Sequence, residues 1–252
     1  MKSWPRLDRD PVCLHVLPGQ DFELWATLIE LCALLQGHWT LVGGQMVLLH
    51  AVENDVDLPR VSTDLDILVN ARIVSRGVRG FVAAIERRGF ALDGMSPDGI
   101  AHRYRRGGVS VDVLAPDGLG ARPDLTTTPP GRTVQVPGGT QALARTQLVP
   151  VIFDGRVGMV PRPSLLGAIV SKAVAVNVDD VPDAQRSDLA LLLSLVDDPL
   201  EMAAHLTSKD RQRLRARGEM IDRDGPAWAV LSAGRVDRGI AAYRILCAQP
   251  LR

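Results

Sequence analysis

The sequence predicts an α/β (α+β) protein in which a small mixed sheet, flanked by helices, is followed by a helical C-terminal part. Residues 41–69 carry most of this prediction, because an apolar strand ends at Gly43-Gly44 and a helix-like run follows it. A second strand then alternates over residues 64–69, with the sequence DLDILV. From Pro199 onward the chain instead reads as a series of helices.

The composition indicates a folded protein of one large domain or two small ones. Of its 252 residues, 46% are hydrophobic, which is enough to bury a sizeable core. The longest uncharged apolar run, near residues 165–170, is far shorter than the roughly 20 residues that a membrane span requires. Residues 1–5 lack a signal-peptide core, so we expect a cytoplasmic protein without membrane contact. The net charge of zero gives no global attraction to nucleic acid.

Turn residues and apolar periods place the elements of the first 160 residues. Helices are expected over 21–35, with Asp21 as N-cap, from Gly44 to about Val52, and over 75–88. Strands are expected over 39–42, 64–69, 90–92, 101–105, 109–114, 133–136, 149–153 and 156–160, with loops over 54–62 and 117–131. Gly107-Gly108 and Asp154-Gly155 are typical of two-residue hairpin turns.

After a domain boundary near Pro161, helices are expected over 164–176, 184–196, 200–206, 210–221, 227–233 and 238–247, with an acidic loop over 179–183. The first of these helices is strongly apolar, and Lys172 is its one charged residue. Nearly all other basic residues are arginines, so Lys172 invites a functional explanation, although it could simply extend to water. The alternating basic residues of 209–217 are typical of a solvated helix face and could alternatively contact RNA phosphates.

Asp64 and Asp66 share one face of their predicted strand, because successive side chains of a strand point to opposite faces. Neighbouring carboxylates repel each other, and a bound cation most naturally offsets that repulsion. Hard oxygen ligands suit Mg²⁺ or Mn²⁺. Asp112, on a strand that can lie beside the first, supplies a third carboxylate. These aspartates predict a metal site, in preference to a solvated strand face or a turn-forming pair.

Gly43 and Gly44 predict a phosphate-binding turn beside this metal site. A glycine pair between a strand and a helix lets the backbone approach a phosphate and places amide N–H groups against it. On its own, such a pair is often only a turn.

Together, the Gly-Gly pair, the Asp-x-Asp strand and the lone aspartate on a later strand resemble the nucleotidyltransferase superfamily with the DNA polymerase β-like palm. The Arg-x-Ser-Thr-Asp-Leu-Asp motif of residues 60–66, the Lys172 helix and the Arg-x-Asp of residues 186–188 are most similar to AbiEii-type toxins, including the MenT toxins. The resemblance implies a nucleotidyltransferase-like catalytic domain over 1–160. It implies that a helical domain over 161–252 completes the nucleotide site.

The resemblance also implies roles for individual residues. Nucleotide contacts are implied for Gly43, Gly44, Ser62, Thr63 and Lys172. Metal binding and catalysis are implied for Asp64, Asp66 and Asp112. The last of these would help to activate the attacking hydroxyl, and Asp188 would be a further catalytic acid. The structural alternatives are hydrogen bonds within the loop for Ser62 and Thr63, and a favourable helix-dipole position for Asp188.

The implied activity is metal-dependent transfer of an NMP from an NTP, such as ATP, to an acceptor hydroxyl, with Mg²⁺ or Mn²⁺ as cofactor. The toxin resemblance implies tRNA or another RNA as acceptor and a cognate antitoxin protein as partner. The neutral net charge favours an alternative enzyme that modifies a small molecule or a protein side chain. A degenerate, non-catalytic nucleotide-binding module is favoured by the long gap from Gly44 to Asp64 and by Leu191, where the toxins have a second acidic residue.

Overall fold

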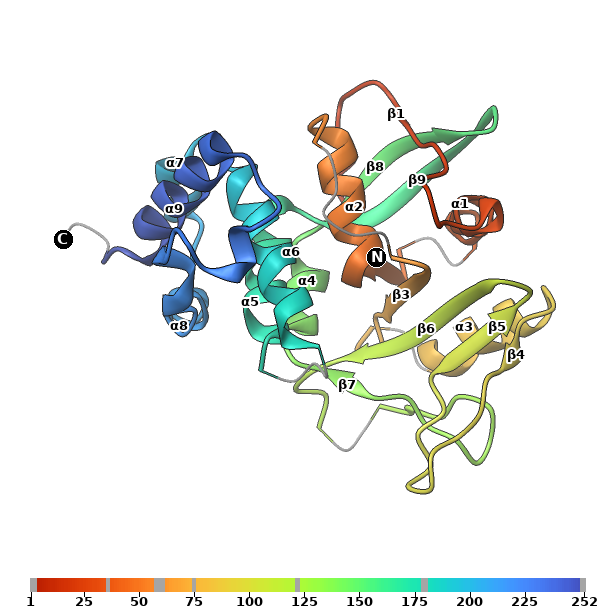
Figure 1. Ribbon diagram of the computed structural model, residues 1–252. Helices are drawn as coiled ribbons and strands as arrows, with labels where there is room; N and C mark the ends of the chain where they lie inside the picture. Colours follow the sequence, from red (N-terminus) through yellow and green to blue (C-terminus); the bar gives the residue numbers. More distant parts are fainter. Residues whose placement is uncertain are drawn as a thin grey trace. The chain divides into compact units, whose positions relative to one another are not determined.

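Figure 1 shows the protein as a computed structural model, which describes residues 4–34, 37–56, 62–73, 76–120, 123–177 and 181–249. The chain forms two compact units. The first contains the described residues up to Leu49 and those from Ser62 to Ser164, and the second contains those of 50–56 and those from Leu165 onward. The predicted α/β class, with mixed sheet and flanking helices, is confirmed. Parts of the loops predicted at 54–62 and 179–183 lie outside the described residues.

The first unit contains a six-stranded mixed sheet with the order β2-β3-β6-β5-β4, in which β7 also pairs with β6. Its strands are β2 (Trp39–Val42), β3 (Asp64–Val69), β4 (Ala91–Leu92), β5 (Arg103–Arg106), β6 (Val109–Pro116) and β7 (Gln135–Val136). β6 is parallel to β3 and β7, whereas the pairs β2–β3, β5–β6 and β4–β5 are antiparallel. The predicted Gly107-Gly108 turn joins β5 to β6 and pairs Arg106 with Val109.

A second sheet of the first unit has the order β1-β8-β9. Its strands are β1 (Val12–Cys13), β8 (Thr146–Phe153) and β9 (Arg156–Pro163). The predicted hairpin around Asp154-Gly155 is present, with Phe153 paired to Arg156. β9 continues through Pro161 and Pro163, where the sequence predicted a boundary. An edge strand tolerates proline because its missing N–H can face away from the ladder.

Three helices belong to the first unit: α1 (Phe22–Cys32), α3 (Gly77–Glu86) and α4 (Gly139–Ala144). A fourth helix, α2 (Gly43–Glu53), begins in the first unit and ends in the second. α1 begins where predicted, because the Asp21 carboxylate accepts a hydrogen bond of 2.9 Å from the Glu23 N–H. α4 was not predicted, because a helix of six residues is too short to show a helical apolar period.

The two faces of β3 and β6 have different environments. One face is fully buried and consists of Leu65, Ile67, Val111 and Val113. α1 and α3 both contact these two strands. The opposite face carries the three aspartates at one end, and at its other end Leu68 and Leu114 pack against Ala142 and Leu143 of α4. The strand residues on either side of the carboxylates are therefore buried in hydrophobic core, which holds the two strands in position.

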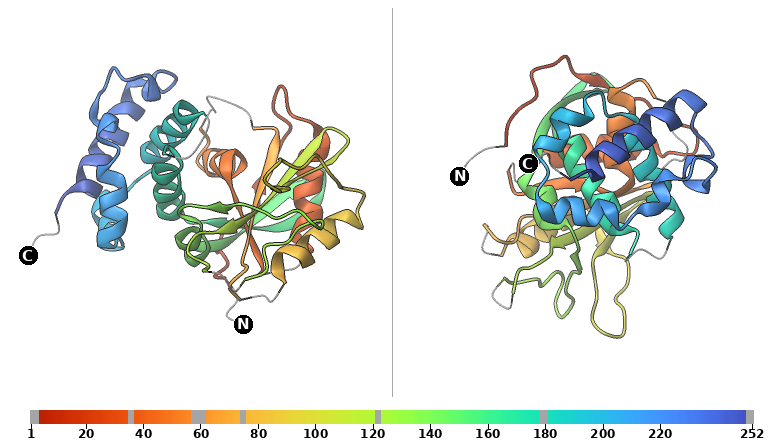
Figure 2. Two further views of the ribbon diagram at one scale, coloured as in Figure 1. Left: turned by 90° about the horizontal axis from the view of Figure 1, so that it is seen from below. Right: turned by 90° about the vertical axis from the view of Figure 1, so that its left-hand side faces the viewer.

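The second unit contains helices and no strand among its described residues (Figure 2). These helices are α5 (Leu165–Ala175), α6 (Pro182–Ser194), α7 (Pro199–Ala204), α8 (Ser208–Arg215) and α9 (Ala233–Cys247). Two short 3-10 helices, η1 (Gly218–Ile221) and η2 (Pro226–Trp228), lie between α8 and α9. The helix α6 packs against both α5 and α9.

Two helices predicted in this unit were wrong in extent. The helix expected over 210–221 is interrupted after Arg215, and a 3-10 turn resumes at Gly218. The helix expected over 227–233 is only the three-residue turn η2. Trp228 is buried there but Val230 is 60% exposed, so the apolar residues do not form one continuous buried face.

Two basic residues of α8 donate hydrogen bonds to backbone carbonyls of neighbouring helices. Arg211 donates hydrogen bonds to the carbonyl oxygens of Ala203, Leu246 and Ala248, and Arg215 donates to that of Cys247. These acceptors belong to the C-terminal ends of α7 and α9, where helix carbonyls lack partners within the helix. The two arginines therefore cap helices, and Arg215 and Lys209 are at the same time exposed, as expected of a solvated face.

No helix within the described residues combines the length and the apolar character needed to cross a membrane. The three cysteines are free thiols: Cys13 is exposed, Cys32 is buried and Cys247 is partly buried. Burial raises the pKa of the Cys32 thiol to about 12, which keeps it neutral at physiological pH.

Close packing between α1 and β9 predicts a measurable effect of a small substitution. A Cβ added at Gly158 would lie 2.8 Å from Ile29 Cδ1 and 3.6 Å from Cys32 Cβ. Because Ile29 Cδ1 is the end of a flexible side chain that can shift, Gly158→Ala should lower the free energy of unfolding by only about 1 kcal/mol, measured by urea denaturation. Gly80→Ala is the matched control, because nothing lies within 4 Å of its Cβ position in α3.

The control should instead raise the stability by roughly 0.5–1 kcal/mol, because alanine is the better helix former. A Gly158→Ala protein as stable as the wild type would contradict the described packing of α1 on the hairpin.

Candidate metal centre

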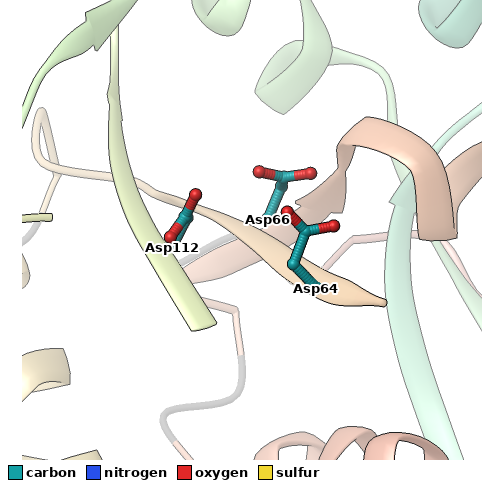
Figure 3. A group of neighbouring side chains, drawn as sticks. All are labelled: Asp64, Asp66 and Asp112. Carbon is teal, nitrogen blue, oxygen red and sulfur yellow. The ribbon is translucent and has the colours of Figure 1, made fainter. Parts of the chain in front are cut away.

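Three carboxylates converge where β3 lies beside β6 (Figure 3). The parallel register pairs Asp66 directly with Asp112, and it pairs Asp64 with Ser110. One carboxylate oxygen from each of the three aspartates lies within 4.8 Å of the others. Asp112 is buried, whereas Asp64 and Asp66 are partly exposed. The structure therefore brings together all three residues that the sequence predicted as metal ligands.

The charge of this cluster requires compensation. Two carboxylates about 4 Å apart repel each other by roughly 4 kcal/mol at the effective dielectric constant of about 20 that applies near a protein surface. Hard anionic oxygens at this spacing are the donors that Mg²⁺ and Mn²⁺ prefer. The cluster can therefore hold a divalent cation, and its chemistry suits those two metals better than soft ones.

Gly43 makes room for the Asp66 carboxylate. β2 pairs Val42 with Asp66, and Gly43 then turns the chain from β2 into α2. Gly43 has a φ of +66°, which side-chain-bearing residues rarely adopt, and a Cβ on it would overlap the Asp66 carboxylate. The N-terminus of α2 therefore begins beside Asp66, and its partial positive charge favours anions at this point.

Ser62 positions Asp64 from the segment before β3. Its hydroxyl donates a hydrogen bond of 2.7 Å to Asp64 Oδ1, and Ser62 itself is buried. Its backbone carbonyl accepts a hydrogen bond of 2.6 Å from the side chain of Gln45, a fully buried residue of α2. The structural alternative for Ser62 is thus realised, and a nucleotide contact stays a prediction. Thr63, the next residue, is exposed and directly precedes β3.

Arg103 supplies a cation to the cluster from β5. It lies opposite Asp112 in the antiparallel β5–β6 pair. Its Nε donates to Asp112 Oδ1 at 2.8 Å and its Nη2 donates to Asp112 Oδ2 at 2.7 Å. The same Nη2 is 3.8 Å from Asp64 Oδ2. The hydrogen bonds to Asp112 raise the pKa of Arg103 above its already high usual value.

Lys172 and Asp188 lie in the second unit, where they form a buried ion pair. Lys172 Nζ is 2.8 Å from Asp188 Oδ2 and donates to Gln185 Oε1 at 2.7 Å. The two charged side chains are 4% and 3% exposed. The pair therefore joins α5 to α6 through desolvated charges. The predicted contacts of Lys172 with a triphosphate and the catalytic role of Asp188 stay predictions.

The sequence prediction missed two residues that support the cluster. Arg103 bonds directly to Asp112, and Gln45 bonds to the backbone of Ser62, which in turn bonds to Asp64. A usable signal existed for Arg103, because the predicted Gly107-Gly108 turn pairs Arg106 with Val109 and so fixes every later pair of the hairpin. Three steps along that ladder, Arg103 meets Asp112. Gln45 gave a weaker signal, as a single amide in an otherwise apolar helix.

Known protein families and curated proteins offer no match to this chain. Among solved structures, the chain is similar to a protein described as an antigenic nucleotidyltransferase-like protein from Paracoccidioides brasiliensis. The two chains are 14% identical, with 85% of this chain and 96% of the other covered and a TM-score of 0.49. A likeness at this level assigns neither a family nor an activity.

The overlap at Gly43 predicts loss of metal binding on a minimal substitution. Gly43→Ala should displace the Asp66 carboxylate and weaken Mn²⁺ binding by about 10- to 100-fold, measured by isothermal titration calorimetry. Gly19→Ala is the matched control, because Gly19 also has a positive φ, of +86°, but nothing lies within 4 Å of its Cβ position. The control pays only the backbone strain and should retain the Mn²⁺ affinity. Equal affinity in both variants would contradict the role of Gly43 as space for Asp66.

The buried ion pair predicts a rescue between two substitutions. Lys172→Met removes the ammonium that lies 2.8 Å from the buried Asp188 carboxylate and should lower the free energy of unfolding by about 3–5 kcal/mol, measured by urea denaturation. The double variant Lys172→Met/Asp188→Leu removes both charges and should recover most of that loss. If the double variant were as unstable as the single one, the two side chains would not be energetically coupled.

Proposed function

We propose that the protein is a metal-dependent nucleotidyltransferase of the DNA polymerase β-like superfamily, which moves an NMP from an NTP to an acceptor hydroxyl. One observation carries the proposal: three carboxylates from two parallel strands converge beside a glycine turn that opens a helix. In this proposal a metal-binding site, formed by the aspartates, lies next to an anion-binding site, formed by the N-terminus of α2. Nucleotidyl transfer needs that combination, because the substrate is a polyphosphate that reacts at one of its phosphorus atoms.

Each part of the site has a role in this reaction. Asp64, Asp66 and Asp112 would hold the divalent ion, which when bound stabilises the charge that develops on the phosphate oxygens. The free N–H groups in the first turn of α2 bind phosphate oxygens. Asp112 takes the proton of the acceptor hydroxyl through a lone pair that the hydrogen bonds from Arg103 leave on one of its two oxygens. The acceptor oxygen then bonds to the α-phosphorus while the bond to the bridging oxygen breaks, and pyrophosphate leaves.

The helical unit, which the structure places from Leu165 onward, completes the nucleotide site in this proposal. Lys172 is the residue we assign to the β- and γ-phosphates, because an ammonium is a compact point charge suited to them. Asp188 then holds the lysine in place when no nucleotide is bound, as the distance of 2.8 Å between their charged atoms supports. Nucleotide binding would exchange a carboxylate partner for phosphate oxygens.

The acceptor that we propose is RNA, with tRNA as the first candidate. The motif of residues 60–66 supports this acceptor through its likeness to AbiEii-type toxins, and the same likeness supports a cognate antitoxin as protein partner. A small-molecule acceptor is the second candidate. It is favoured by the arginines of α8, because Arg211 and Arg215 donate to helix-end carbonyls and form no free basic row for RNA. It is also favoured by the net charge of zero.

Transfer of label from each α-³²P-labelled NTP tests the proposal, with tRNA, total RNA and a panel of small hydroxyl compounds as acceptors. We expect Mg²⁺- or Mn²⁺-dependent transfer that falls by about 10²-fold or more in Asp66→Asn, because one ligand of the charge-stabilising ion is lost. Asp93→Asn is the matched control, since Asp93 pairs with Arg105 at 3.1 Å and does not belong to the cluster of three aspartates.

The control should retain the wild-type rate. The proposal is wrong if no acceptor is labelled by the wild type, or if Asp66→Asn transfers label as fast as Asp93→Asn. Label in small molecules but not in RNA would support the transferase and reject the RNA acceptor.

A further inference from the structure

The strand β5 presents two arginines on the face of the sheet that carries the three aspartates. The antiparallel register pairs Arg103 with Asp112 and Arg105 with Ser110, so both arginines lie on that face. Tyr104, between them, is fully buried, as expected of the opposite face, which packs against helices. Residues two apart on a strand are about 7 Å from each other. These two residues, here termed the β5 arginines, therefore form a short row that begins at the metal centre.

Both guanidinium groups are exposed and have hydrogen-bond donors to spare. The side chains of Arg103 and Arg105 are 44% and 55% exposed. Arg103 uses Nε and Nη2 for its hydrogen bonds to Asp112, and Arg105 Nη2 lies 3.1 Å from Asp93 Oδ2. A guanidinium carries five N–H donors. Each arginine can therefore bind a second anion on its exposed side while it keeps its carboxylate partner.

We infer that the β5 arginines bind backbone phosphates of an RNA acceptor, so that the acceptor strand lies along β5 with its reacting hydroxyl at Asp112. This inference rests on the proposed function and adds the surface that holds the acceptor. Arginine suits this role, because its planar fork of donors matches phosphate oxygens and phosphate contacts fix the register of a nucleic acid on a protein.

The order of the strands places the two anion-binding groups on opposite sides of the aspartates. In the order β2-β3-β6-β5, Gly43 and the start of α2 lie beside Asp66, whereas Arg103 lies beside Asp112. Nucleotidyl transfer is an in-line displacement, in which the attacking and leaving oxygens lie on opposite sides of the phosphorus. With the leaving pyrophosphate at the start of α2, the acceptor reaches the phosphorus from the side of β5.

The extent of the row favours a chain of phosphates over a small acceptor. Arg103 lies at the metal centre, where any acceptor would contact it, but Arg105 lies about 7 Å further along β5. A small acceptor bound at Asp112 would leave Arg105 without a role. An RNA strand carries a negative charge at every nucleotide, so it can occupy both arginines at once.

Binding of a short, fluorescein-labelled single-stranded RNA tests the inference, measured by anisotropy with Mg²⁺ and without NTP over a series of salt concentrations. Arg105→Gln should weaken binding by about tenfold at low salt. It should also reduce the slope of log K against log salt by about 0.7, the value for one phosphate contact of a single strand. Arg79→Gln is the matched control, because Arg79 is exposed on α3, which packs on the opposite face of the sheet. The control should keep the wild-type affinity and slope.

Two further variants separate a phosphate contact from a structural role of Arg105. Arg105→Lys keeps the charge and should keep the wild-type salt slope, although it loses the planar fork. Asp93→Asn removes the carboxylate partner but leaves Arg105 in place, so it should bind RNA as tightly as the wild type does. If Asp93→Asn instead weakens binding as much as Arg105→Gln, the ion pair supports the strand and the inference is wrong.

Failure of the inference is distinguishable from failure of the proposed function, because binding and label transfer are measured separately. If the wild type binds no RNA, or if Arg105→Gln binds it with the wild-type affinity and slope, the β5 arginines hold no RNA acceptor. Transfer that depends on Asp66 would then still support the transferase. If RNA binding depends on Arg105 but the wild type labels no RNA, this RNA is not an acceptor and the inference is overturned.

Discussion

The parallel pairing of β3 with β6 places Asp66 beside Asp112. Several contacts of the first unit position or compensate these like charges. The register cannot relax, because a shift by one residue would move the buried face of both strands into solvent. Leu68 and Leu114 further along the aspartate face are held by α4, which fixes the strands from the other end. The fold therefore fixes this repulsion in place, and neighbouring protein groups offset part of it.

Those protein groups come from three separate parts of the chain. Gly43 leaves space for Asp66 at the start of α2, Ser62 donates a hydrogen bond to Asp64 just before β3, and Arg103 of β5 donates hydrogen bonds to Asp112. Gln45 ties two of these together, because it belongs to α2 and bonds to the backbone of Ser62. Substitution of one such group is thus expected to disturb more than one carboxylate.

Local signals predicted the parts of the fold that depend on neighbouring residues. The strand β2, the Asp21 cap of α1 and both two-residue hairpins follow from turn chemistry and apolar alternation. The helix α4 and the continuation of β9 through Pro163 were missed because they depend on distant partners. α4 packs against Leu68 and Leu114, which are distant in the sequence, and the prolines are tolerated because β9 is an edge strand of its sheet. The pairing of Lys172 with Asp188 likewise depends on how α5 packs against α6, which periodicity does not specify.

The short turn between β5 and β6 has a consequence for how this site can change over evolution. Because Gly107 and Gly108 alone connect the strands, every pair of the ladder is counted from them, and the meeting of Arg103 with Asp112 is fixed by the turn. A shift of this ladder by one residue would turn the guanidinium to the other face of the sheet, and it would also bring the fully buried Tyr104 to the aspartate face. The turn length and the burial of Tyr104 therefore both constrain which residue can lie opposite Asp112.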